Sequence, residues 1–353
     1  MFTGGGTAGH VTPNIALIHV LHRDGWQIDY LGSPDGVEKD MINAIHIPYH
    51  PVKSGKLRRY FSWKNFFDPI MIVLGIGQSF FLLRRLKTDI VFSKGGFVAF
   101  PVVVGAWLNR IPVVAHESDM SPGLANRLSF PFVDRICVTF AAAKKHFKRP
   151  EKVEVTGTPI REELFEGNKL RGLALCRFNQ EKPVLLVVGG SQGAAVMNAC
   201  IREGLDTLRK QFQVIHICGK GKVDDRLKHD EGYCQFDYVD EDMADLFAAT
   251  DLVVSRAGAN SLYEILALAK PHVLIPLSRE VSRGDQIQNA RYFEQQGISS
   301  VVNEETLTVE TLLTAISEVY KNREEVTIKI KKLGIKSATM KVIDTITQLT
   351  TKN

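Results

Sequence analysis

The sequence predicts an α/β protein with two doubly wound parallel-sheet domains that face a cleft. It has 353 residues, and at roughly 150 residues per domain this length favours two domains. Short β-branched runs alternate with helical stretches, which is typical of parallel sheets with helices on both faces. The alternation restarts after residues 156–159, Thr-Gly-Thr-Pro. Ligands of such domains bind beyond the carboxyl ends of the strands, so we expect the binding residues in the loops there.

The predicted elements follow this division. The N-terminal domain is expected over residues 1–160, with strands at 28–31, 89–93, 112–115, 135–138 and 153–155. The linker is expected near residues 157–166 and the C-terminal domain over 161–335, with strands at 184–188, 214–218, 234–238, 252–255 and 272–276. Residues 336–353 are expected to form a C-terminal helix that packs back on the N-terminal domain. Only three residues precede the first glycine, so the first strand is very short or the sequence is clipped at its start.

The composition excludes several classes of protein. With 44% hydrophobic and 24% charged residues, the chain is an ordinary globular protein and not a disordered one. Its five cysteines are widely spaced without a C-x-x-C pair, which excludes a disulfide framework or a zinc ribbon and favours a reducing cytosol. No signal peptide is recognised, and the longest apolar run, residues 70–83, is shorter than the roughly 20 residues of a membrane-spanning helix. The sequence therefore predicts a soluble or peripheral protein.

Positive charge is concentrated in one segment. The chain carries +5, but residues 53–87 alone hold eight basic residues and one acid, a local charge of +7. A nucleic-acid-binding protein would spread its basic residues over a broader face, so we expect no nucleic-acid partner. The apolar centre of the segment suits a helix that lies in the headgroup region of an anionic phospholipid surface, and a helix of the domain core is the alternative. The expected membrane residues are Ile72, Phe80, Phe81, Arg84 and Arg85.

Glycine-rich turns follow four of the expected strands. Glycine lets backbone N–H groups approach a phosphate, and the N-terminus of the following helix adds a partial positive charge. A tight strand-to-helix turn explains any one of them, but four on one chain indicate a ligand that bears a diphosphate. The turns are residues 4–10 (GGGTAGH), 95–96 (GG), 189–194 (GGSQGA) and 256–261 (RAGANS).

The fourth turn suggests the kind of nucleotide. The first turn is not G-x-G-x-x-G and no acid ends a clear second strand, which weakens a nicotinamide site. The fourth turn has no Walker lysine, which weakens a phosphoryl-transferring NTPase. Glu264 follows Arg256 by eight residues, on the helix that Asn260 and Ser261 would open. Its carboxylate can chelate two ribose hydroxyls while the loop amides face phosphate.

Together with further motifs, these turns resemble the MurG family of GT-B glycosyltransferases. The further motifs are KGGF at 94–97, HESDMSPGLAN at 116–126, TGTPIR at 156–161 and GDQIQNA at 284–290. The resemblance implies the GT-B fold and an inverting, metal-independent transfer of N-acetylglucosamine that needs no cofactor. The donor would be UDP-N-acetylglucosamine, and the acceptor would be undecaprenyl-pyrophosphoryl-N-acetylmuramoyl-pentapeptide (lipid I), which becomes lipid II in peptidoglycan synthesis. It also implies a peripheral place at the cytoplasmic face of the bacterial plasma membrane, with other cell-wall synthesis and division proteins as partners.

The resemblance also implies roles for individual residues. The N-terminal domain would hold the acceptor diphosphate, and the C-terminal domain would hold the donor, with Ser191 near its diphosphate and Gln286 near the sugar hydroxyls. The implied acceptor residues are Gly5, Gly6, Gly95, Gly96 and Asp119. The implied donor residues are Thr7, Gly9, His10, Arg161, Ser191, Arg256, Gly258, Asn260, Ser261, Glu264 and Gln286. The chain departs from some members of the family at Phe97 (tyrosine there), Ser118-Asp119 (Gln-Asn) and Asp285 (glutamine).

Two residues are candidates for the catalytic base that takes the proton of the acceptor hydroxyl. The reference pKa of histidine is near neutral, and the expected helix N-terminus beside His10 favours its neutral ring. Asp119 is the rival base, and His10 has the alternative role of a hydrogen-bond donor to the acceptor phosphate. His116 and Glu117 follow an apolar strand and suit structural or acceptor-positioning roles better than catalysis.

A metal site is weighed at Asp240-Glu241-Asp242, a D-x-D sequence of the kind that grips a nucleotide diphosphate through a divalent ion. The sequence precedes an amphipathic helix, so we favour the interpretation that its acids cap the helix and meet its dipole. Loop amides and Arg256 or Arg161 would then replace the metal. Other functions stay open: a different GT-B transferase from a UDP-hexose to lipid, an NAD-dependent oxidoreductase, and a non-catalytic lipid-binding protein.

Overall fold

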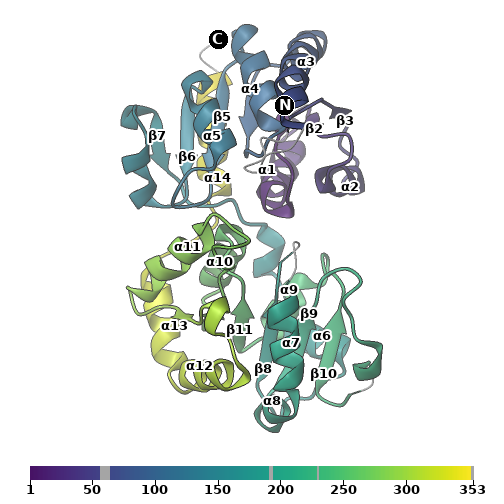
Figure 1. Ribbon diagram of the computed structural model, residues 1–353, viewed down its shortest axis with the longest axis vertical. Coiled ribbons are helices and arrows are strands. Elements are labelled where there is room, and N and C mark those ends of the chain that lie inside the picture. Colours follow the sequence, from purple (N-terminus) through teal and green to yellow (C-terminus); the bar gives the residue numbers. More distant parts are fainter. Residues whose placement is uncertain (56–63, 191–193, 229, 351–353) are drawn as a thin grey trace. The chain divides into compact units, whose positions relative to one another are not determined.

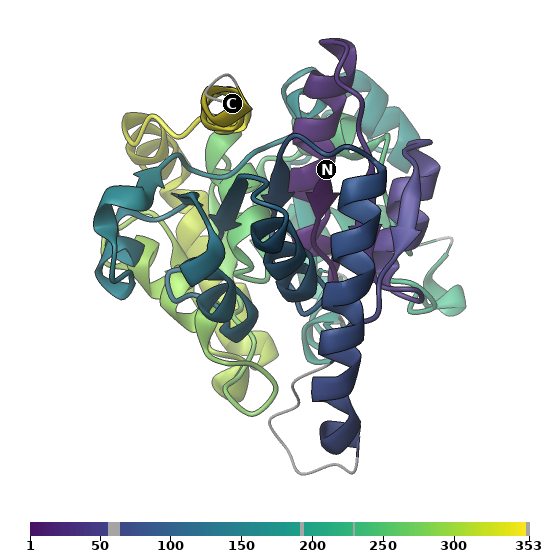
Figure 2. The same ribbon diagram turned by 90° about the horizontal axis from the view of Figure 1, so that it is seen from above.

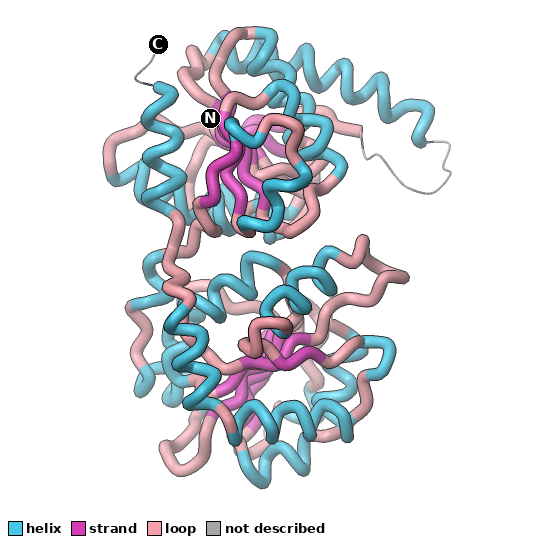
Figure 3. Tube along the Cα trace, turned by 90° about the vertical axis from the view of Figure 1, so that its left-hand side faces the viewer, coloured by secondary structure: helices cyan, strands magenta, loops and turns pink. Residues whose placement is uncertain are grey.

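The protein divides into two compact units. Residues 1–55, 64–190, 194–228 and 230–350 are described by a computed structural model. Unit 1 contains Met1–Arg161 together with the chain from Ser337 onward, and unit 2 contains Glu162–Lys336. Each unit has one parallel sheet with helices on both faces, shown in Figures 1 and 3. The predicted fold class of two doubly wound parallel-sheet domains is confirmed.

Unit 1 is built on a sheet with the strand order β3-β2-β1-β4-β5-β6-β7, and every neighbouring pair is parallel. From β1 the chain adds strands first on one side of the sheet (β2, β3) and then on the other (β4 to β7), so the strand order reverses between β1 and β4. Ligands of doubly wound sheets bind at the carboxyl ends of the strands beside such a reversal. The strands are β1 (Phe2–Thr3), β2 (Tyr30–Gly32), β3 (Tyr49–Pro51), β4 (Val91–Ser93), β5 (Val113–Glu117), β6 (Arg135–Val138) and β7 (Val153–Val155).

Helices from both ends of the chain cover this sheet. The last helix packs beside the first, as Figure 1 shows, and its Val342, Ile343 and Ile346 lie in one core cluster with Phe2 and Ile18. The connection is fixed by the hydroxyl of Ser337, which donates to the carbonyl oxygen of Ile160 at 2.8 Å. The helices are α1 (Thr12–Arg23), α2 (Val37–Ala44), α3 (Lys64–Arg85), α4 (Ala99–Leu108), α5 (Leu124–Ser129) and α14 (Thr339–Thr350).

Unit 2 repeats the same plan with the order β10-β9-β8-β11-β12-β13, again wholly parallel. Here the reversal lies between β8 and β11. The strands are β8 (Val184–Val188), β9 (Gln213–Ile217), β10 (Tyr233–Phe236), β11 (Leu252–Ser255), β12 (His272–Leu274) and β13 (Ser300–Val301). The helices are α6 (Lys169–Cys176), α7 (Ala195–Glu203), α8 (Leu205–Gln211), α9 (Met243–Ala249), α10 (Ala259–Ala267), α11 (Asp285–Glu294), α12 (Val309–Lys321) and α13 (Arg323–Lys332).

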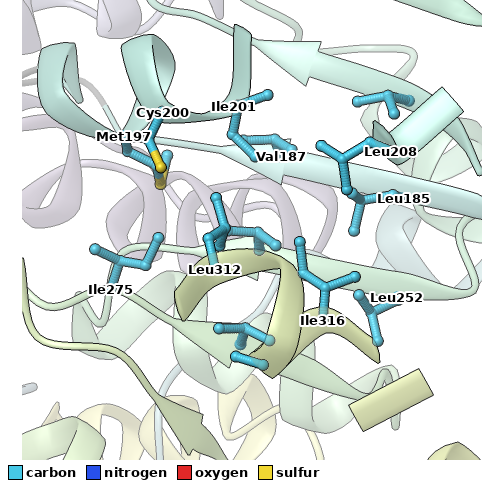
Figure 4. Packing of buried hydrophobic residues seen from close by; sticks show 14 of the residues in the cluster. Leu185, Val187, Met197, Cys200, Ile201, Leu208, Leu252, Ile275, Leu312 and Ile316 are labelled. Atoms are coloured by element: carbon cyan, nitrogen blue, oxygen red, sulfur yellow. The ribbon is translucent and has the colours of Figure 1, made fainter. Parts of the chain in front are cut away.

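One face of the second sheet is covered by α7, α8 and α12, which Figure 4 shows from close by. The apolar residues of α12 recur at helical spacing, so that Leu312, Ile316 and Val319 all point at the strands. A capping box between Thr308 and Thr311 begins this helix. Each fully buried Leu or Ile side chain stabilises the fold by about 1.5–3 kcal/mol.

Each predicted strand agrees with an observed strand to within two residues at both ends. The strands Arg135–Val138, Val153–Val155, Val184–Val188 and Leu252–Ser255 have the predicted bounds. The prediction at 28–31 is wrong by one to two residues, since β2 begins at Tyr30, and a two-residue strand precedes Gly4. The sequence does not predict the edge strands β3 and β13, which are three and two residues long.

Helix α3 stands at the edge of unit 1, as Figures 2 and 3 show. Its inner face packs on α4, where Leu83 and Ser79 are fully buried. Its outer face exposes Val73 and Phe81, each to about 70% (67% and 71%). Within the described part of the chain, every helix is too short or too polar to cross a bilayer.

Candidate active site

The glycine turns of unit 1 lie together at the carboxyl edge of its sheet. The turn after β1 begins at Gly4, the turn after β4 begins at Lys94, and the loop after β5 begins at Ser118. Because β1, β4 and β5 are neighbours in a parallel sheet, the three loops meet at the point where the connection reverses. The structure therefore brings together the residues that the sequence assigns to the acceptor.

Two of these turns pack back to back. The amide of Gly5 donates to the carbonyl oxygen of Gly95 at 3.2 Å. Gly96 has φ +87°, and a Cβ on it would collide with the carbonyl oxygen of Gly5. Only glycine combines this backbone conformation with this close approach. The amide of Gly5 is therefore committed to the neighbouring turn.

The amide of Gly6 is also committed, to a carboxylate that the sequence does not single out. Glu38 on α2 is fully buried and accepts from the amides of Gly6 at 3.1 Å and Ser33 at 3.0 Å, and from the hydroxyl of Ser33. An acid in the first turn of a helix is explained by the helix dipole, so the sequence carries no further signal for it. The turn is thus anchored on both sides, by Gly95 and by Glu38.

His10 ends a short 3-10 turn, Ala8–His10, two residues before α1. Its Nδ1 lies 3.1 Å from the hydroxyl of Thr7, a contact that fixes the orientation of the ring. A ring whose Nδ1–H donates to Thr7 carries its basic lone pair on Nε2. His10 and Thr7 are half-buried at the same edge as the glycine turns.

The loop after β5 is organised by the buried carboxylate of Glu117. It accepts from the amide of Asp119 at 3.0 Å, the amide of Gly123 at 3.2 Å and the side-chain amide of Asn126 at 2.8 Å. Asn126 also lies against Gly95, so Glu117 links this loop to the turn after β4. Three N–H donors to one carboxylate make Glu117 a residue that shapes the loop, while the side chain of Asp119 is half-buried.

Beneath these loops lie two buried groups with shifted pKa values. Burial lowers the pKa of Lys94 to about 8, against the opposing charges of Glu117 and Asp119, and its ammonium donates to the hydroxyl of Ser118. Burial, with a further contribution from Lys94, holds the pKa of His116 well below its usual range. The Nε2 of His116 donates to the carbonyl oxygen of Gly157 at 2.8 Å. His116 is therefore a neutral structural histidine.

In unit 2, the loop after β11 and the helix α11 form a second cluster. Gly258 is the N-cap of α10, and a Cβ on it would lie 3.9 Å from the Nε2 of Gln286 on α11. Gln286 accepts from the amide of Leu277 at 3.1 Å, and Asn289 donates to the carbonyl oxygen of Ala257 at 3.3 Å. Asn260, Ser261 and Glu264 follow this loop on α10, and all three are half-buried. Ser191 lies outside the described residues.

Arg256 is held more tightly than the sequence suggests. It is 5% exposed, its Nη1 donates to the carbonyl oxygen of Ile275 at 3.1 Å, and its Nη2 forms an ion pair with Glu304. Glu304 also accepts from the amide of Ser278 at 3.1 Å. The guanidinium therefore ties together the chain after β11, β12 and β13. Glu304 lies 48 residues from Arg256, so the sequence gives no signal for this pair.

The structure tests the capping prediction for the D-x-D sequence at Asp242. Asp242 stands at the N-cap of α9, but its side chain makes no capping hydrogen bond, so the capping prediction is wrong for this residue. Asp245, in the first turn of α9 and outside the D-x-D sequence, accepts from the amide of Asn168 at 2.6 Å and pairs with Arg171. Among the residues that the structure describes, no group of three or more His, Cys, Asp or Glu is arranged to hold a metal ion.

Comparison with known proteins decides the family. Residues 1–138 match the glycosyltransferase family 28 N-terminal domain, and residues 184–346 match the glycosyltransferase family 28 C-terminal domain. The chain belongs to glycosyltransferase family 28. A family 28 relative from Legionella pneumophila (strain Paris) is 65% identical over 343 residues, which are 97% of this chain and 94% of that protein. It is named UDP-N-acetylglucosamine--N-acetylmuramyl-(pentapeptide) pyrophosphoryl-undecaprenol N-acetylglucosamine transferase.

Two further comparisons support this placement within family 28. A protein of the same name from Clostridium tetani is 50% identical over 346 residues, covering 98% of this chain and 96% of that one. The crystal structure of Acinetobacter baumannii MurG superposes with a TM-score of 0.76 at 26% identity, covering 99% of this chain and 98% of the other. The resemblance to the MurG family is confirmed, and the chain is a glycosyltransferase of the GT-B fold.

Proposed function

We propose that this chain transfers N-acetylglucosamine from UDP-N-acetylglucosamine to the lipid-linked N-acetylmuramoyl-pentapeptide, the step that converts lipid I to lipid II. The observation that carries the proposal is the 65% identity, along almost the whole chain, to a transferase named for this donor and acceptor. The glycine turns at the carboxyl edges of both sheets support it, because ligands of doubly wound sheets bind at these edges. The NAD-dependent and non-catalytic alternatives have no comparable support.

The donor would bind at the cluster of unit 2. In this proposal the carboxylate of Glu264 accepts from the ribose hydroxyls, and the start of α10 at Gly258 faces the diphosphate, where the helix dipole favours negative charge. Gln286 would contact the sugar hydroxyls. Arg256, whose two Nη atoms donate inside unit 2, would act mainly by holding the loop in place.

The acceptor would bind at the edge of unit 1. Its hydroxyl attacks the anomeric carbon, the bond from that carbon to the UDP oxygen breaks with inversion, and the hydroxyl proton passes to a base. His10 is the proposed base, since its ring is fixed by Thr7, and Asp119 is the alternative. The donor roles of Thr7, Gly9 and Arg161, all in unit 1, stay predictions.

UDP release tests the proposed reaction. The full chain would be given UDP-N-acetylglucosamine and a water-soluble, short-chain analogue of the lipid acceptor. We expect UDP release that depends on the acceptor, and a product heavier by one N-acetylglucosamine residue. UDP-glucose and UDP-galactose serve as matched controls. Release with these donors but not with UDP-N-acetylglucosamine would contradict the proposal in favour of a different transferase of the same fold.

We further propose that unit 1 docks on an anionic membrane surface. Four apolar side chains on the outer face of α3 recur at helical spacing and are exposed, while the adjoining α4 exposes Trp107 to 52%. The α3 residues are Ile70, Val73, Leu74 and Phe81. Of the residues expected from the sequence, Phe81, Arg84 and Arg85 are exposed, whereas Ile72 and Phe80 are half-buried. Exposed apolar side chains next to basic ones suit the headgroup region of a bilayer.

A place at the cytoplasmic face of the plasma membrane belongs to this proposal. Cell-wall synthesis and division proteins as further partners are supported by the resemblance alone. Sedimentation with anionic vesicles tests the docking surface, with neutral vesicles as the matched control.

A further inference from the structure

Lys94 is a buried cation that the proposed reaction does not use. It is 1% exposed and is the first residue after β4, beside the reversal of the sheet. Its amide donates to the carbonyl oxygen of Thr3 at 2.9 Å, and its side chain passes beneath Gly4. Its ammonium donates to the hydroxyl of Ser118 after β5. Through its amide and its side chain, one residue thus joins the ends of β1, β4 and β5.

The charges that face Lys94 are mostly negative. Glu117 and Asp119, from the end of β5 and the loop after it, stabilise its protonated form. His116 on β5 is the cationic candidate nearby, but its pKa is held well below the usual range, so it stays neutral. On the far side of the glycine turn lies the buried carboxylate of Glu38. Lys94 is therefore a buried positive charge that faces two carboxylates at this edge.

This arrangement has a consequence for an anionic acceptor. A diphosphate at the edge of unit 1 is repelled by the carboxylates, and the amides of Gly5 and Gly6 donate elsewhere. A buried positive charge at the same edge offsets this repulsion with little screening by salt. A lysine that served only to fill space would be replaced at lower cost by an apolar side chain, because burial of a charge is unfavourable.

We propose that Lys94 is a positioning residue for the acceptor, whose ammonium fastens the loop of Asp119 to the end of β4 and offsets the carboxylates when a diphosphate binds. This inference rests on the proposed function. It assigns to Lys94 no contact with the reacting atoms, since the side chain is buried beneath the loops. The charge acts through the field at the acceptor edge and through the hydrogen bond to Ser118.

Kinetics of charge-neutral variants test the proposal. The full chain would carry Lys94→Met or Lys94→Gln, the second of which keeps a donor for Ser118. Michaelis constants for the short-chain acceptor and for UDP-N-acetylglucosamine would be measured from pH 6 to 9.5. We expect both variants to raise the Michaelis constant for the acceptor about tenfold or more, because a nearby positive charge is lost. The Michaelis constant for UDP-N-acetylglucosamine should stay unchanged.

The pH profile separates the charge from the hydrogen bond. In the wild type, kcat/KM for the acceptor should fall as the pH rises through about 8, where Lys94 loses its proton. This fall should be absent from Lys94→Met and Lys94→Gln and present in Ser118→Ala, which keeps the charge.

Three results would overturn the role of Lys94: an unchanged Michaelis constant for the acceptor in both variants, the same alkaline fall in both, or equal losses for donor and acceptor. A wild-type chain that releases no UDP with this acceptor would instead contradict the proposed function itself, so the two failures are distinguishable.

Discussion

Replacing Lys94 by methionine should make unit 1 more stable, although we expect the same change to weaken acceptor binding. Burial lowers the pKa of Lys94 from 10.5 to about 8. Each pKa unit corresponds to about 1.4 kcal/mol, so keeping the buried amine protonated costs about 3 kcal/mol. The residue is 1% exposed, so solvent does not reduce this figure. The variant also loses the hydrogen bond to Ser118, which destabilises it by about 1 kcal/mol. The net stabilisation of Lys94→Met is therefore about 2 kcal/mol.

The pH dependence gives this prediction its sign. The pKa of Lys94 is lower in the folded state than in the unfolded state, so between about pH 8 and 10.5 the unfolded chain holds a proton that the folded chain lacks. The stability of the wild type therefore rises with pH across this window, relative to a chain without Lys94. The advantage of Lys94→Met should be full at pH 7 and should shrink towards pH 10.5.

The assay is urea unfolding followed by tryptophan fluorescence. The chain has three tryptophans, Trp26, Trp63 and Trp107, and all belong to unit 1, so the signal reports that unit alone. Wild type and variant would be compared at pH 7 and pH 9.5. A variant that is less stable than the wild type at pH 7, or an advantage that does not shrink at pH 9.5, would refute the argument that Lys94 is a buried charge.

Further predictions follow from other contacts. Glu264→Ala should weaken UDP binding in calorimetry by about 2 kcal/mol, roughly 30-fold, through loss of charge-assisted hydrogen bonds to the ribose; unchanged affinity would make Glu264 structural. His10→Ala should lower turnover at least tenfold with donor affinity unchanged, and an equal loss of donor affinity would place His10 at the donor. Changing Arg84 and Arg85 to glutamate should weaken sedimentation with anionic vesicles at low salt, because each basic residue near the surface contributes about 1 kcal/mol; binding that ignores both salt and charge reversal contradicts docking by charge. Gly96→Ala should destabilise unit 1 by about 2 kcal/mol or more in the same fluorescence assay, since φ is +87°, and an unaltered midpoint would contradict the close approach to Gly5.

The sequence predicts the architecture because its signals are local. A run such as Val184–Val188 is apolar at every position, as expected of a strand that is buried on both faces of a sheet. Glycines mark the turns between such strands and the helices that follow them. The edge strand β13 has only Ser300 and Val301, both half-buried, and so offers no apolar run to recognise. A strand of this kind forms because the neighbouring strand, here β12, supplies the hydrogen-bond partners of its backbone.

The site is predicted only in part, for a related reason. The glycine turns and Glu264 are visible as motifs, but the partners of those motifs come from distant positions. Glu38 lies 32 residues from Gly6, Ser118 lies 24 residues from Lys94, and Glu304 lies 48 residues from Arg256. These pairings depend on which strands become neighbours. In the sequence, a lysine or glutamate that the fold buries cannot be distinguished from one that stays on the surface.

The membership of α14 in unit 1 has a consequence for synthesis on the ribosome. The core of unit 1 includes Val342, Ile343 and Ile346, which are translated only after the whole of unit 2. Unit 2 is one uninterrupted stretch, Glu162–Lys336, so all of its strands are available before the terminal helix emerges. Domains usually fold in order from the N-terminus as they are synthesised. Here unit 1, whose synthesis begins first, cannot complete its fold until unit 2 has been synthesised. During that interval the apolar surface that α14 covers is open to chaperones, and a messenger cut short directly after the codons of unit 2 would yield a chain whose second unit is complete and whose first is not.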